Sequence, residues 1–86
     1  MILRITQVQK VFLIEKVLQG KKELIKHIMK GNIISGKWQV DVSNIVADEI
    51  RDLCSEMLQL LGFDEYYELT EYGELLEELV DILYIG

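Results

Sequence analysis

Apolar residues along the chain recur mainly at helical spacing. In residues 44–62, NIVADEIRDLCSEMLQLLG, a rotation of about 100° per residue gathers the apolar side chains on an arc of roughly 160°. The remaining arc is polar and mostly acidic, and Asp41, Ser43 or Asn44 can cap the helix. This is the clearest helix that the sequence predicts. Its inward residues are expected to be Val46, Ile50, Leu53, Cys54, Met57, Leu58, Leu60 and Leu61.

A second amphipathic pattern predicts a helix that begins near Thr70, whose hydroxyl can cap the first turn. Leu75, Leu79 and Ile82 belong to its apolar side, which we expect to face the core. The opposing arc, about 120° wide, holds only carboxylates among its charged residues. We expect these carboxylates to face outward: Glu71, Glu74, Glu77, Glu78 and Asp81.

Residues 6–18 predict a helix with Val8, Val11, Phe12 and Leu18 on one side. Because residues 11–18 are apolar almost all round, this helix should be central or lie at a subunit contact. Gly20 is expected to end it.

Residues 21–30, KKELIKHIMK, predict a basic amphipathic helix. Gly31-Asn32 is expected to close it in the left-handed conformation that glycine favours. One arc of this helix carries Leu24, Ile25, Ile28 and Met29, and the other carries Lys22, Lys26 and Lys30.

Two short stretches break the helical period. Trp38, Val40 and Val42 alternate with polar residues after a Ser-Gly turn, which is typical of a half-buried strand. Residues 1–5, MILRI, can form a second strand that pairs with it. We therefore predict a mostly α-helical, single small domain over residues 1–86, with about four helices and one short β element as an open alternative.

Composition narrows the class of protein. Half of the 86 residues are apolar, which is typical of a globular chain. A core of this size cannot bury all of them, and a homodimer contact or an obligate partner can cover the apolar surface that remains. The single Cys54 excludes an internal disulfide. The longest early apolar run, VFLI, is too short for a signal peptide or a membrane span, so we expect a cytoplasmic protein with no membrane partner.

Charge is divided along the chain. Residues 1–38 carry eight basic side chains and two acidic ones, whereas residues 39–86 carry thirteen acidic side chains and only Arg51. The formal net charge of -6 hides this division. We infer that the two halves face each other, face a partner, or both.

Residue types that carry catalysis are scarce. Cys54 falls within the apolar arc of its helix, which predicts a buried structural thiol, and His27 lies off the apolar arc of its own helix, which predicts a surface histidine. Ser35, Ser43 and Ser55 lack the context of a nucleophile elbow, and the glycines form no phosphate-binding loop. We predict no enzyme, and no catalytic, metal or cofactor site.

Residues 66–76, YYELTEYGELL, resemble the last wing strand and following helix of winged-helix transcription regulators, in which a Tyr-x-Leu-Thr-x-x-Gly segment joins the two. The resemblance implies DNA binding, with residues 44–62 as the recognition helix. Since the outward face of that helix is acidic and repels phosphates, we expect nucleic acid to be an unlikely partner. The alternative DNA-binding surface is the lysine face: Lys22, Lys26, Lys30 and Lys37.

Residues 60–83, LLGFDEYYELTEYGELLEELVDIL, are similar to the C-terminal part of small acidic bacterial proteins of the immunity type found in toxin systems. The resemblance implies a non-catalytic, antitoxin-like inhibitor that occludes a basic toxin domain.

An acidic face on a rigid helix attracts such a partner, and tyrosine is a frequent interface anchor. A homodimeric structural adaptor, whose basic and acidic halves pair between subunits, is the remaining alternative. The predicted partner-binding residues are Glu71, Glu74, Glu77, Glu78, Asp81, Tyr66 and Tyr72.

Overall fold

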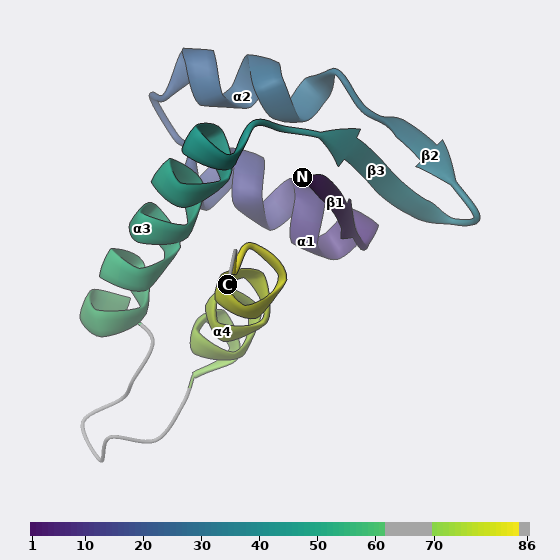
Figure 1. The fold of residues 1–86 in the computed structure, drawn as a ribbon. Coiled ribbons are helices and arrows are strands. Elements are labelled where there is room, and N and C mark those ends of the chain that lie inside the picture. Colours follow the sequence, from purple (N-terminus) through teal and green to yellow (C-terminus); the bar gives the residue numbers. More distant parts are fainter. Residues whose placement is uncertain (62–69, 85–86) are drawn as a thin grey trace.

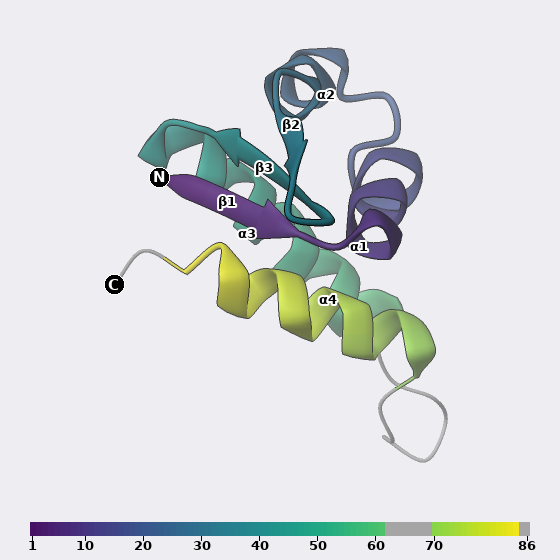
Figure 2. The ribbon, with the colours of Figure 1, turned by 90° about the vertical axis from the view of Figure 1, so that its right-hand side faces the viewer.

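A computed structural model of the chain describes residues 1–61 and 70–84 (Figure 1). Helices pack around a three-stranded antiparallel sheet in the strand order β1-β3-β2. In Figures 1 and 2, α2 and α4 lie at opposite ends of the molecule, with β1, α1 and α3 between them. The elements are β1 (Ile2–Ile5), α1 (Gln7–Phe12), η1 (Leu13–Val17), α2 (Lys22–Met29), β2 (Asn32–Ile34), β3 (Lys37–Asp41), α3 (Asn44–Leu61) and α4 (Glu71–Ile82).

The predicted helical fold is confirmed, and its β part is larger than one short element. β1 pairs with β3 in a register that sets Leu3 opposite Val40 and Ile5 opposite Trp38, which places all four side chains on the buried face. β2 was not predicted, because all three of its residues are exposed and show no alternation. Ser35 and Gly36 form the turn between β2 and β3 with φ of 52° and 79°, the two-residue geometry that suits the twist of a hairpin.

The first helix changes its winding part-way. Thr6 caps α1 and exchanges hydrogen bonds with Gln9, whose backbone N–H donates to the Thr6 hydroxyl at 3.1 Å. From Leu13 the helix widens to a π-turn, in which the Leu18 N–H donates to the Leu13 carbonyl at 2.8 Å. The wider turn resets the helical register, so Leu13, Val17 and Leu18 are all buried.

The four residues predicted to share one side of this helix do not share one environment. Phe12 and Leu18 are buried, whereas Val8 and Val11 are exposed, and Val8 is 64% exposed. A run that is apolar almost all round does not specify one inner face by its periodicity, so packing decides.

The two helix-ending glycines differ in their role. Gly20, expected to end the first helix, follows the end of η1 in the left-handed conformation, with a φ of +80° and open space around it. Gly31 does not take that conformation, so the second stop was predicted wrongly. A Cβ at Gly31 would lie 2.4 Å from the carbonyl oxygen of Gln39 and 2.7 Å from Cβ of Val40. Glycine is needed there because the end of α2 passes directly against β3.

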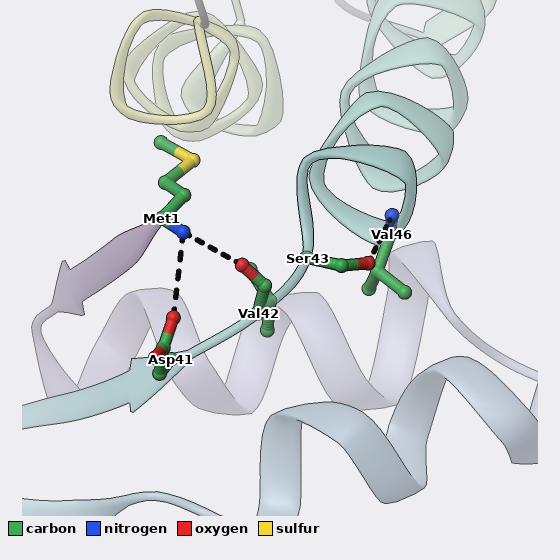
Figure 3. A network of polar contacts seen from close by, with 5 residues as sticks. All are labelled: Met1, Asp41, Val42, Ser43 and Val46. Carbon is green, nitrogen blue, oxygen red and sulfur yellow. Dashed lines mark hydrogen bonds and ion pairs between the residues drawn. The ribbon is translucent and has the colours of Figure 1, made fainter.

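Ser43 is the cap of α3, since its hydroxyl accepts the Val46 N–H at 3.1 Å (Figure 3). Asp41, the alternative cap, instead lies 3.3 Å from the Met1 amino group, which also donates to the Val42 carbonyl at 2.8 Å. These contacts hold the first residue to the end of β3.

The buried line of α3 consists of Ala47, Ile50 and Cys54, whereas Leu53, Met57 and Leu58 are only partly buried. Leu60 was expected to face inward and is 79% exposed, and the side chain of Leu61 lies outside what the structure describes. α4 begins where predicted, with the Thr70 hydroxyl accepting the Gly73 N–H at 3.0 Å. Leu76, Leu79 and Leu83 fix its inner face.

Candidate protein-binding surface

The five carboxylates predicted on the last helix are all exposed: Glu71, Glu74, Glu77, Glu78 and Asp81. They lie on the side of α4 opposite its fully buried leucines, as the helical spacing requires. Within residues 1–61 and 70–84, none of them forms an ion pair with a Lys or Arg. The acidic face of α4, defined by these five residues, is therefore available to a partner.

Glu78 has a structural contact that the sequence did not indicate. Its Oε2 accepts a hydrogen bond of 2.9 Å from Nε2 of Gln9, whose side chain is only 8% exposed. The Oε1 of Gln9 in turn accepts the Thr6 N–H at 2.9 Å. Glu78 thus joins α4 to the capped start of α1, in addition to facing solvent.

Tyr72 is 52% exposed at the start of α4, and its ring stacks on Phe12 with centroids 5.6 Å apart and planes at 22°. A hollow of about 200 Å³ adjoins this pair and is lined by Phe12, Lys16, Met57, Tyr72 and Leu76. Residues from α1, η1, α3 and α4 therefore meet at one apolar depression, with the Tyr72 ring as part of its wall.

A second, more open hollow of about 420 Å³ continues along the outer side of α1 and η1. It shares Phe12 and Lys16 with the first, and its other lining residues are Gln7, Val8, Val11 and Glu15. We call the two hollows together the α1–α4 groove. Its floor is apolar, and its charged lining residues are Lys16, which lines both hollows, and Glu15, which lines the second.

Sequence reasoning found the acidic face but not the groove. The only available signal was the all-round apolar character of residues 11–18, which predicted a central helix or a contact surface. Of the predicted binding residues, Tyr66 lies outside the described residues, as does the strand-like segment on which the winged-helix resemblance depends.

The basic half of the chain presents a different surface. Lys22, Lys26, Lys30 and Lys37 are all exposed, as predicted, and Lys26 lies 3.5 Å from Glu23 of the same helix. A shallow hollow between α2 and α3 brings Lys21 near three carboxylates of α3: Glu49, Asp52 and Glu56. The basic and acidic halves therefore meet at this junction, where the carboxylates of α3 lie near Lys21.

Groups with catalytic potential are few in the described part of the chain. Cys54 is buried, as predicted, and burial raises the pKa of its thiol from 9.0 to about 12, which disfavours the reactive thiolate. His27 is half-buried rather than fully at the surface. No cluster of three or more His, Cys, Asp or Glu side chains suited to a metal ion occurs among the described residues. In the same residues, no helix has the length and apolar character needed to span a membrane.

Comparison of the chain with protein families, with curated proteins and with solved structures gives no match.

Proposed function

We propose that the chain is a non-catalytic protein-binding domain that docks on a basic partner protein through the α1–α4 groove and the acidic face of α4. By covering the functional surface of that partner it acts as an immunity or antitoxin-like inhibitor. The observation that carries the proposal is the half-exposed Tyr72, stacked on Phe12 at the edge of an apolar hollow.

The chemistry of this surface suits a protein better than a small polar ligand. Protein interfaces concentrate their binding energy in a few aromatic or apolar anchors at well-packed hollows, surrounded by polar residues. Tyr72, Val8 and Val11 offer apolar contact area, and the carboxylates of α4 lie on the adjoining helix. Fixed carboxylates raise the rate of encounter with a basic partner, and the apolar floor slows dissociation.

The choice of an inhibitor follows from the resemblance of residues 60–83 to immunity-type proteins and from the sign of the charge. A toxin that acts on nucleic acid binds phosphate and so has a basic active surface. An acidic domain that covers this surface excludes the substrate without any chemistry of its own.

The test begins with a partner identified from the same cell, and compares its association rate with two charge-matched variants. In the first, Glu74, Glu77 and Asp81 of α4 become Lys; Glu78 is left intact because it binds Gln9. In the control, Glu49, Asp52 and Glu56 of α3 become Lys. Both variants raise the formal net charge from -6 to zero, so only the position of the charges differs.

We expect the α4 variant to associate at least about tenfold more slowly than the wild type at low salt, and the α3 variant to change far less. Tyr72→Ala should speed dissociation and weaken binding by about 2 kcal/mol or more, while Tyr84→Ala, which removes another exposed tyrosine, serves as its control. Wild-type kinetics in both the α4 variant and Tyr72→Ala would show that this face is only a solubility surface.

A further inference from the structure

The first hollow of the α1–α4 groove has the size of a site for a small molecule. Its volume is about 200 Å³, and apart from Lys16 the lining residues that the structure describes are apolar or aromatic. An apolar cavity of about 150 Å³ is enough to bind benzene, whereas sites for drug-sized ligands begin near about 300 Å³. The hollow therefore has room for one ring with a short substituent.

The walls of this hollow favour an aromatic ring. Phe12 and Tyr72 already stack with ring centroids 5.6 Å apart, and the Tyr72 side chain is 52% exposed. The uncovered part of the Tyr72 ring leaves surface against which another ring can pack. Met57, partly buried on α3, adds a thioether sulfur, which makes favourable contacts with aromatic rings. An aromatic ligand therefore gains more here than an aliphatic one of the same size.

Lys16 gives the hollow one positive charge. It is exposed, and within residues 1–61 and 70–84 it forms no ion pair with a carboxylate. Its neighbour Glu15 lines only the second hollow. A carboxylate on a ligand in the first hollow would accept a charge-assisted hydrogen bond from the Lys16 ammonium, which is stronger than a bond between neutral groups.

The π-turn accounts for the position of this lysine. Leu13 and Val17 of η1 are buried, whereas Lys16 stays exposed and lines the same hollow as Phe12, four residues earlier. Single π-turns inside helices are frequent at functional sites. Here the turn brings one cation and one buried aromatic ring to the lining of a single hollow.

We propose that the first hollow binds a small aromatic carboxylate, with the ring packed against Phe12 and Tyr72 and the carboxylate at the Lys16 ammonium. This site goes beyond the proposed function, which concerns a protein partner. Because the hollow is part of the α1–α4 groove, a bound ligand occupies surface that such a partner would cover, and the two compete. Binding of the ligand itself requires no partner.

Phenylacetate is the probe for this site, since it joins one ring to one carboxylate. It is titrated into the isotope-labelled chain at low ionic strength and neutral pH, and the backbone amide chemical shifts are followed by NMR. Phenylacetamide, which has nearly the same shape without the charge, and acetate, which has the charge without the ring, are the control ligands.

We expect saturable shifts at Phe12, Lys16 and Leu76, with a Kd of about 5 mM or tighter, as suits a ligand of so few atoms. Phenylacetamide should bind at least about threefold more weakly, because it cannot pair with Lys16. Acetate should cause no saturable shift, because it leaves the apolar part of the hollow empty.

Two variants and a position control assign the ring and the carboxylate to their contacts. Lys16→Gln should bind phenylacetate no more tightly than phenylacetamide and leave phenylacetamide binding unchanged, because only the charge is lost. Tyr72→Ala should weaken both aromatic probes at least about threefold. Lys22→Gln, which removes an exposed lysine of α2, should bind as the wild type does. Circular dichroism verifies that each variant is folded.

The absence of a saturable shift up to about 50 mM phenylacetate overturns the proposal. Equal affinity for phenylacetate and phenylacetamide also overturns it, because Lys16 then takes no part in recognition. A preference for the carboxylate that survives Lys16→Gln does the same, since another group then holds the anion. All of these measurements use the chain alone, so their failure leaves capture of a basic partner untouched, and a failure of that capture does not alter the titration.

Discussion

Helices α2 and α4 have the same amphipathic design but differ in how deeply they are packed. α4 buries Leu76, Leu79 and Leu83 completely, whereas α2 buries Ile28 completely, covers Leu24 less tightly, and leaves Met29 half-exposed. The helical spacing of apolar and polar residues indicated which side of each helix would face the core. It did not specify how many neighbours would cover that side, which depends on the elements that surround it.

Helices α2 and α4 also differ in what surrounds their charged residues. The carboxylates of α4 lie beside a groove and next to a structural contact with Gln9, whereas the lysines of α2 form a row on an outer face with Glu23 of the same helix as a partner. A charged helix face becomes a candidate binding surface when an apolar depression adjoins it. At α2, the adjoining hollow is shallow and lined mostly by charged residues, Lys21 with Glu49, Asp52 and Glu56.

The difference in packing depth predicts the largest effect. Leu79→Ala in α4 should lower the free energy of unfolding by about 2–5 kcal/mol, because it opens a cavity in a fully enclosed site. Leu24→Ala in α2 should cost about 1–2 kcal/mol, since the edge of the core can relax around the loss. Urea unfolding followed by circular dichroism measures both values. Equal costs would mean that α2 is as deeply enclosed as α4, contrary to the comparison.

The attachment of α2 to the sheet predicts the next effect. Gly31→Ala should lower stability by roughly 1–3 kcal/mol, because its Cβ meets the backbone of β3, which cannot move aside without disturbing the sheet. It should also shift the fluorescence of Trp38, whose ring nitrogen bonds to Ile28 at the end of α2.

Gly20→Ala is the control for this substitution. Gly20 also has a strained backbone for alanine, at a cost of about 1–2 kcal/mol, but nothing lies within 4 Å of its added Cβ. The fluorescence of Trp38 should therefore stay unchanged. A shift of the same size in both variants would show that the close approach at Gly31 is not what holds Trp38.

The polar contacts of the two helices predict the smallest effect. A double-mutant cycle of Gln9→Ala and Glu78→Ala should give a coupling energy of about 0.5–1.5 kcal/mol, because Gln9 is buried. The same cycle for Glu23 and Lys26 should give about 0.5 kcal/mol or less and vanish at high salt, because both side chains are exposed. A larger coupling energy for Glu23 and Lys26 than for Gln9 and Glu78 would show that the Gln9–Glu78 hydrogen bond does not hold α4 to α1.

Local signals account for what the sequence predicted well. The starts of α3 and α4 were identified because the cap residues Ser43 and Thr70 act on amides within three residues of themselves. The Ser-Gly turn was likewise recognisable, because its residues set their own backbone conformation.

The predictions that failed concern contacts between segments far apart in the chain. A glycine at a helix end ordinarily indicates a left-handed stop, and only the position of β3 reveals that Gly31 serves a close approach. Val8 and Val11 were expected to share one side with Phe12 and Leu18, because periodicity carries no sign of the π-turn that begins at Leu13.

The candidate binding surface also has one part that the local sequence predicted and one part that it did not. The five carboxylates follow from one helix and were predicted, whereas the α1–α4 groove is assembled from α1, η1, α3 and α4 and was not. The partner of Glu78 is 69 residues away in the chain, so no local pattern could indicate it.

Because Cys54, the single thiol of the chain, is buried, its chemical labelling can be used to follow the opening of α3. A thiol reagent reaches it only when the helix separates from the core, so the labelling rate reports how often that happens. The raised pKa also links this opening to alkalinity. Between pH 9.0 and about 12 the unfolded chain releases a proton that the native thiol retains, so native stability falls as the pH rises through this window. Below it, the neutral thiol behaves as one more apolar group in the core.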